Sequence, residues 1–227
     1  MLDSFFQHQR ISYTGLGELR GNGQFIRRSA LAACGYFNEE TITDDLDLTF
    51  RLHLNGWDIE FCIYPAVGEE GVTGLVGLWH QRNRWGEGGY QRYLDYWRLI
   101  AQNRMGTLKT IDVLSFGIMQ YILPSVAIPD LMLAVTKHRV PVLAPLSTIA
   151  LSLTLTGLVV GVRRVHRARF PETPLPLGGL LIQVLRGFFY MFHWFAIVGF
   201  TSIRMALLPK RLKWVKTVHS GGSVDPT

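Results

Sequence analysis

Two long apolar runs constrain the fold of this chain more than any other feature. Residues 111–128 are uncharged apart from Asp112, and residues 140–162 carry no charge at all. A helix that crosses a membrane needs about 20 such residues. Both runs therefore predict transmembrane helices, in which Pro124 and Pro145 are tolerable.

A third apolar stretch, residues 175–208, contains Arg186, His193 and Arg204. An arginine at mid-depth costs roughly 3 kcal/mol. Basic clusters precede the first apolar run, follow the second and follow the third. The positive-inside rule puts all three clusters on the cytoplasmic side. The third stretch must then cross twice or not at all, so we expect a short hairpin, a re-entrant pair or an interfacial helix.

The composition limits the classes of partner. The chain has 227 residues, a net charge of +6 and 48% hydrophobic residues. Basic charge with high apolar content indicates a nucleic-acid binder or a protein on an anionic membrane. The basic residues flank apolar spans and form no continuous face, so we expect an anionic membrane and no nucleic acid. Cys34 and Cys62 lack metal-type spacing and fit a reducing compartment.

The first 75 residues have a mixed α/β pattern. Residues 23–35 predict a short extended piece and a short helix that ends at Gly35. Residues 43–54 repeat apolar positions every four residues, which predicts a helix ended by Asn55-Gly56. Residues 57–65 alternate and stop at Pro65, as a strand would. Residues 78–104 are aromatic and basic, which predicts an amphipathic segment at a membrane interface with arginines facing lipid.

Three short motifs could carry chemistry. The first is Thr43-Asp44-Asp45 at the start of the predicted helix. The helix dipole keeps a carboxylate there ionised, so it could accept a proton, although ordinary helix capping by Thr43 explains the same residues. Asp47 would point about 200° around the helix from Asp45. It is expected to be structural or to partner Arg27, Arg28 or Arg51.

The second motif is Gln81-x-x-Arg84-Trp85, and the third is Gly21-Asn22-Gly23. An arginine fork with a nearby amide matches phosphate oxygens, and an indole ring can stack on a sugar. The alternative for the second motif is an interfacial Arg–Trp anchor. The glycines permit close approach of a ligand to the backbone, or a plain turn, and they do not fit a dinucleotide fingerprint.

Together the motifs resemble the family 2 inverting glycosyltransferases, which include cellulose, chitin and hyaluronan synthases. The resemblance rests on "TDD", on "QRNRW" 36 residues after Asp45, on the membrane helices that follow, and on "GNGQFIRR" and "WVKT". Many relatives have Glu where Asp44 stands, but the family's base aligns with Asp45. The stretches "TDDLDLTFRLHL", "LWHQRNRW" and "KRLKWVKTVH" are similar to the branch that glucosylates diacylglycerol in cyanobacteria.

The resemblance implies a fold and roles for individual residues. Residues 1–77 would be the C-terminal part of an α/β catalytic domain of the GT-A type. An interface segment (78–108), membrane helices (109–209) and a basic cytoplasmic tail (210–227) would follow. Asp45 would be the general base, with Thr43 and Asp44 supporting it. Gln81 and Arg84 would bind the donor diphosphate, while Trp85 and the loop of Gly21, Asn22 and Gly23 would line the acceptor path.

The resemblance also implies partners and a missing part. The donor would be a nucleotide sugar and the acceptor a membrane lipid, at the cell inner or thylakoid membrane with the catalytic part cytoplasmic. Mg²⁺ or Mn²⁺ would be bound by an upstream nucleotide-binding half, so no metal ligand is expected in this chain. In the family that metal is held by an Asp-x-Asp motif. Asp45-Leu46-Asp47 matches the pattern of this motif, but it lies too close to Gln81 in the sequence to be the metal site. The chain is therefore expected to be a C-terminal half that binds no donor alone.

Three functions stay open. The first is transfer of a hexose, glucose from UDP-glucose, with inversion to a lipid such as diacylglycerol, which would give a β-glycolipid. The second is a processive synthase of a β-glycan such as cellulose, hyaluronan or poly-N-acetylglucosamine. The third is an inactive fragment or a non-catalytic membrane subunit. The few helices favour the lipid acceptor, since a processive enzyme needs a channel across the membrane.

Overall fold

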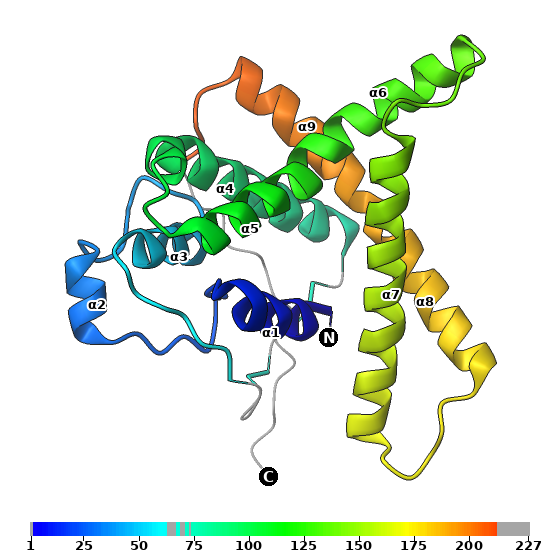
Figure 1. Cartoon of the computed structure of the whole chain (residues 1–227), viewed down its shortest axis with the longest axis horizontal. Helices are drawn as coiled ribbons and strands as arrows, with labels where there is room; N and C mark the ends of the chain where they lie inside the picture. The colour runs from blue at the N-terminus through cyan, green and yellow to red at the C-terminus, as the bar shows by residue number, and fades with distance from the viewer. Residues whose placement is uncertain (1, 63–66, 69–70, 73, 213–227) are drawn as a thin grey trace.

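The computed structural model describes residues 2–62, 67–68, 71–72 and 74–212 (Figure 1). Its regular elements are helices: α1 (Leu2–Thr14), α2 (Arg28–Ala33), α3 (Asp44–Leu54), α4 (Leu75–Ala101), α5 (Thr107–Gly117), α6 (Leu123–Thr136), α7 (Ala144–Arg169), α8 (Leu177–Met191) and α9 (His193–Leu207). A π-helical segment, η1 (Ile118–Ile122), joins α5 to α6. Helices α1 to α4 form one body, from which the apolar helices extend.

The expected α/β fold is wrong for the part of the chain that the structure describes, because no strand occurs there. Residues 57–62 of the expected strand have no regular structure, and residues 63–65 lie outside the described ranges. The segment of residues 57–62 nevertheless lies beside another segment of the chain, at Gly17. Gly17 lies so near it that a Cβ there would be 2.1 Å from the Ile59 carbonyl oxygen.

Side chains explain why these two neighbouring segments form no ladder. Gln7 accepts a hydrogen bond from the Glu18 N–H (3.0 Å) and donates one to the Glu18 carbonyl (2.9 Å). The Leu19 N–H donates to Thr49 Oγ1 (2.9 Å), and His53 Nε2 donates to the Gly17 carbonyl (2.8 Å). Since α1 and α3 satisfy these backbone groups, the groups are not available for strand pairing.

The expected helices at α2 and α3 are confirmed. Gly35 and Gly56 follow them with φ of 75° and 78°, in the left-handed region that glycine adopts without strain. Helix α3 buries apolar side chains on two sides. Phe50 and Leu54 join a cluster with Leu16, Ile100, Met105 and Val113, while Leu48 and Leu52 join another with Leu19, Ala30, Cys34 and Ile59.

Helix α4 is the centre of the body, in contact with α3, α5 and α9. The sequence predicted an amphipathic segment whose arginines face lipid. Whether the segment lies at a membrane interface stays a prediction, but the buried face of α4 is polar and contains Asn83, Glu87, Gln91 and Arg92, so Arg92 faces the protein interior. Because buried polar groups need partners, this face can only pack against elements that supply them.

Three helices are long and apolar enough to cross a membrane, counted over the described residues: Thr107–Thr136, Ala144–Arg169 and Leu177–Leu207. Their mean hydropathies are 1.6, 1.8 and 1.4. They contain the two apolar runs and the third stretch. In that stretch α8 and α9 meet at Phe192 and continue in the same general direction in Figure 1, so they do not form the expected hairpin.

Candidate active site

The site begins where α3 starts. Thr43 occupies the N-cap position, but its side chain makes no capping hydrogen bond, so the expected capping role of its hydroxyl is wrong. The hydroxyl is buried without a partner and packs on α4, because a Cβ at Gly88 would lie 2.1 Å from Thr43 Oγ1. The absence of a side chain at Gly88 therefore lets α3 start directly on α4.

Asp45 lies in the first turn of α3 and is half-buried. Its Oδ1 accepts a hydrogen bond from the Leu46 N–H (2.9 Å). Burial raises the pKa of Asp45 and the Asp44 charge adds to the rise, while the Leu46 N–H, Arg20 and Arg92 oppose it. Asp44 itself is exposed. The raised pKa makes the Asp45 carboxylate a stronger base than an exposed aspartate.

The glycine loop approaches the other oxygen of Asp45. A Cβ at Gly21 would lie 3.8 Å from Asp45 Oδ2. Gly21, Asn22 and Gly23 are all exposed. Gly23 has φ of 62°, and a Cβ there would be 2.7 Å from Val67 Cγ2. The loop thus brings backbone without side chains close to the Asp45 carboxylate, and its contact with an acceptor stays a prediction.

Arg84 and Gln81 lie on α4, one and two turns before Gly88. Burial lowers the pKa of Arg84, and the charges of Asp45 and Asp44 oppose the decrease. Arg84 is therefore within electrostatic range of both carboxylates. Gln81 is half-buried. The contact between α3 and α4 brings the acidic motif and the Gln81–Trp85 motif together, although 36 residues separate Asp45 from Gln81 in the chain.

Trp85 has one ring face in contact with a neighbouring cation. The Arg82 guanidinium lies 4.2 Å from the ring centroid of Trp85, which is a cation–π distance. Arg82 also donates to the Tyr190 hydroxyl (3.2 Å), so it links the motif to α8. One face of the indole is covered by this guanidinium, and a sugar could stack only on the other face.

Asp47 is structural, as the sequence indicated. Its carboxylate accepts from Arg51 Nε (2.7 Å), the Tyr96 hydroxyl (2.7 Å) and Asn38 Nδ2 (3.1 Å). Of the three arginines that the sequence left open as partners, the structure selects Arg51. Among the described residues, no three His, Cys, Asp or Glu side chains are grouped to hold a metal.

A buried ion-pair network that the sequence did not reveal supports the site. Glu18 contacts Arg92 (3.0 Å), Arg10 (3.2 Å) and Arg20 (3.5 Å). Burial alone would raise the pKa of Glu18, but the arginines hold it at about 2. Arg10 also pairs with Asp112 of α5 (2.6 Å). Arg92 stacks on Phe50 of α3 at 4.9 Å. The network thus joins α1, α3, α4 and α5 behind Asp45.

A second buried acid ties α4 to the end of α9. Glu87 is 1% exposed and accepts hydrogen bonds from Arg204 Nη1 (2.6 Å) and the Arg211 N–H (2.9 Å). Gln91 Nε2 donates to the Arg211 carbonyl (3.1 Å). The sequence identified Arg204 as costly within an apolar stretch, but nothing in it pointed to Glu87. The cation is tolerated because it is paired.

The structure thus combines three candidate membrane spans with a carboxylate of raised pKa and an arginine that lie within electrostatic range of each other, on two helices in contact. Comparison with known proteins identifies its family. Residues 3–209 match the family described as "Glycosyl transferase family group 2", and the chain belongs to this family. No solved structure is significantly similar to it.

Curated relatives agree with this membership. The chain is 58% identical over 220 residues to the beta-monoglucosyldiacylglycerol synthase of Nostoc sp. (strain PCC 7120), covering 97% of this chain and 47% of that protein. It is 52% identical over 224 residues to the synthase of the same name from Synechocystis sp. (strain PCC 6803), covering 99% and 47%. It is also 30% identical over 95 residues to a Staphylococcus epidermidis poly-beta-1,6-N-acetyl-D-glucosamine synthase, covering 40% and 22%. The chain thus spans about half the length of its most extensive matches.

Proposed function

We propose that this chain is the acceptor-side part of a membrane glycosyltransferase that moves glucose from UDP-glucose to diacylglycerol with inversion. The observation that carries the proposal is the convergence of Asp45, Arg84 and Gly21 at the contact between α3 and α4. The names of the Nostoc and Synechocystis relatives support the choice of product.

Asp45 is the general base in this proposal. The acceptor hydroxyl gives its proton to Asp45 as its oxygen attacks the anomeric carbon of the sugar. The bond from that carbon to the diphosphate breaks, and the electron pair leaves with the diphosphate. Arg84 and Gln81 stabilise the developing negative charge. Trp85, on the face of its ring opposite Arg82, and the loop at Gly21, Asn22 and Gly23 would contact the acceptor. Thr43 and Asp44 hold the first turn of α3 in place.

The division of the chain into residues 1–77, 78–108, 109–209 and 210–227 remains part of the proposal, with the catalytic part on the cytoplasmic side. The divalent metal, Mg²⁺ or Mn²⁺, would be bound by sequence that this chain does not include. A processive synthase is a second candidate, because part of the chain matches a poly-N-acetylglucosamine synthase. An inactive fragment or a non-catalytic membrane subunit is the third.

One experiment separates these candidates. Membranes are prepared with this chain alone and with this chain joined to the part of the Nostoc relative that it does not match. Both receive labelled UDP-glucose or labelled UDP-N-acetylglucosamine, with diacylglycerol. We expect chloroform-soluble glucose label from the joined protein only. Insoluble polymer would support the processive synthase, and no product from either sugar would support the third candidate.

A further inference from the structure

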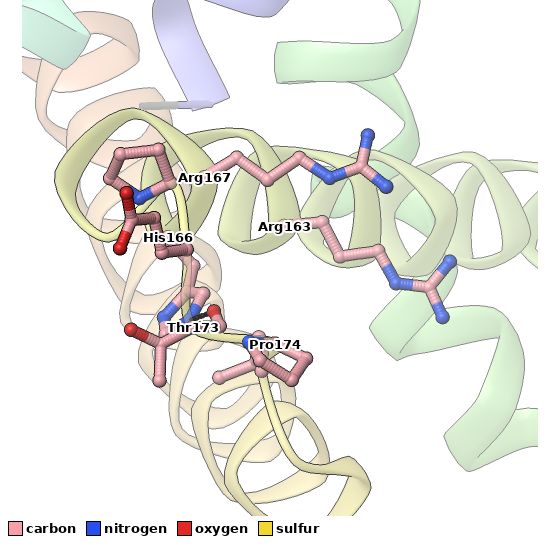
Figure 2. Close-up of a pocket in the computed structure, with 8 residues that line it drawn as sticks. Arg163, His166, Arg167, Thr173 and Pro174 are labelled. Atoms are coloured by element: carbon pink, nitrogen blue, oxygen red, sulfur yellow. Dashed lines mark hydrogen bonds between the residues drawn. The ribbon is translucent and has the colours of Figure 1, made fainter.

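The C-terminal end of α7 gathers positive charge beside a cavity that the proposed glycosyl transfer does not use. Its last two turns contain Arg163, Arg164, His166, Arg167 and Arg169. The cavity measures about 440 Å³, and its lining includes Arg163, Arg167 and the loop of residues 171–175 (Figure 2). This volume lies within the ~300–1,000 Å³ of typical small-ligand sites.

The two lining arginines act as a pair. Arg163 and Arg167 are four residues apart, and in Figure 2 their side chains extend in the same general direction, with the guanidinium groups on the side away from Thr173 and Pro174. Both are exposed, and among the residues that the structure describes neither has a hydrogen-bond or ion-pair partner. Like charges at this spacing destabilise a helix. A shared anion would remove that repulsion, and two guanidinium forks fit phosphate oxygens well.

Neutralising the negative end of the helix dipole is the simpler explanation of the basic cluster. The helix dipole explains why basic residues lie at the end of α7. It does not explain why the loop of residues 171–175 is held beside them and encloses a cavity. His166 Nε2 donates to the Thr173 carbonyl (2.8 Å), which holds the loop against the helix. Pro171 and Pro174 restrict the loop further. Glu172 is the one acidic residue in the lining.

The position of the cavity indicates where the phosphate comes from. Residues 144–162 of α7 are uncharged, and the charges begin at Arg163. The cavity therefore lies at the end of a candidate membrane span, at the depth of lipid headgroups. Helices α7 and α8 also expose apolar side chains, such as Val160 and Leu181, that could contact acyl chains.

We propose that Arg163 and Arg167 form a binding site for the phosphate of an anionic membrane phospholipid. The site is separate from Asp45 and does not depend on the proposed glycosyl transfer. It would seat one lipid headgroup between α7 and the 171–175 loop, and so fix the depth of this helix pair in the membrane.

The test measures lipid binding by the full chain in neutral detergent, with short-chain phosphatidylglycerol, phosphatidylcholine and inorganic phosphate as probes. We expect phosphatidylglycerol to bind at least about tenfold more tightly than the other two. The Arg163→Gln/Arg167→Gln double variant should lose about tenfold or more of that affinity. The matched control, Arg164→Gln/Arg169→Gln, removes the same charge from the same turns but outside the cavity lining, and it should bind nearly as wild type does.

Several results would overturn the proposal. Equal losses in the two double variants would mean diffuse attraction with no site. Equal binding of phosphatidylglycerol and phosphatidylcholine would exclude recognition of anionic lipid. Inorganic phosphate binding as tightly as phosphatidylglycerol would assign the cavity to a soluble anion. An Arg163→Lys/Arg167→Lys variant keeps the charge, so intermediate binding at unchanged helical content by circular dichroism would support the site independently of folding defects.

Discussion

Thr43 Oγ1 lies against the backbone of Gly88, where a Cβ would come within 2.1 Å of it. This contact fixes the start of α3 on α4 and so fixes the separation between Asp45 and Arg84. Within α4, alanine is favoured over glycine by about 0.5–1 kcal/mol. The steric clash at position 88 should outweigh that gain.

We therefore expect Gly88→Ala to destabilise the protein by about 1–3 kcal/mol, because Thr43 and α3 must shift. Thermal unfolding of the protein in detergent measures this. Gly199→Ala is the matched control, since position 199 lies in α9 and a Cβ there meets no atom within 4 Å. A Gly88→Ala protein as stable as the control would mean that the contact is looser than described.

Asp45→Asn should lower glycosyl transfer by about 10²–10⁴-fold in the active joined protein, which is the usual contribution of a general base. Its stability should not fall, because burial of the charged carboxylate is unfavourable and already raises the pKa of Asp45. Transfer rate and unfolding temperature are measured on the same preparation. Glu39→Gln, at an exposed position, is the control. Near-normal transfer by Asp45→Asn would contradict the assignment of the base.

The pH dependence of transfer follows from the same group. Asp45 must be ionised to accept a proton, so the rate should fall as pH decreases through its raised pKa. Arg20 lowers that pKa, and Arg20→Gln should therefore move the acid limb to higher pH. The exposed Arg27→Gln serves as the control. An acid limb that does not move in Arg20→Gln would show that another group controls it.

The sequence predicted the local elements better than their arrangement. The apolar repeat and the Asn-Gly signal located α3, and apolar length located the spans. Glu87, Arg92 and Glu18 were not predicted as buried, because a charge can be buried only when a partner far along the chain is present. The strand at 57–62 failed for a related reason. Its pairing depended on backbone groups at Gly17–Leu19, which the side chains of α1 and α3 satisfy.

Glu18 should contribute pH-dependent stability. Its pKa is lowered from 4.5 to about 2. Its contribution is complete above the unfolded value of 4.5 and is lost as pH falls toward 2. Glu18→Gln should cost about 3–5 kcal/mol at pH 7, because it leaves the buried cations Arg92 and Arg10 without their shared partner.

Unfolding measured at pH 7 and at pH 3 tests this prediction. The variant should lose the decrease in stability that the wild-type protein shows between the two values. Glu60→Gln, at an exposed position, is the control. If Glu18→Gln were as stable as that control at pH 7, the arginines would have to be satisfied by other groups.

The two ends of the apolar region should lie on the same side of the membrane. Lys210 Nζ contacts Asp95 Oδ2 (2.6 Å) and the Arg211 N–H donates to Glu87, so the segment after α9 lies on α4. Helix α4 also leads directly into α5 at the other end of the region. A chain that leaves α4 and returns to it crosses an even number of times. We therefore expect at least one of the three candidate spans not to cross completely.

Single cysteines at Gln102 and Leu212 test this parity in a background of Cys34→Ala and Cys62→Ser. A membrane-impermeant maleimide is applied to sealed vesicles of known orientation, and both exposed positions should react from the same side. Labelling from opposite sides would require an odd number of crossings. The contacts of Glu87 and Asp95 with residues 210–211 could not then form, and Arg204 would need another partner, since an unpaired arginine in an apolar span is costly.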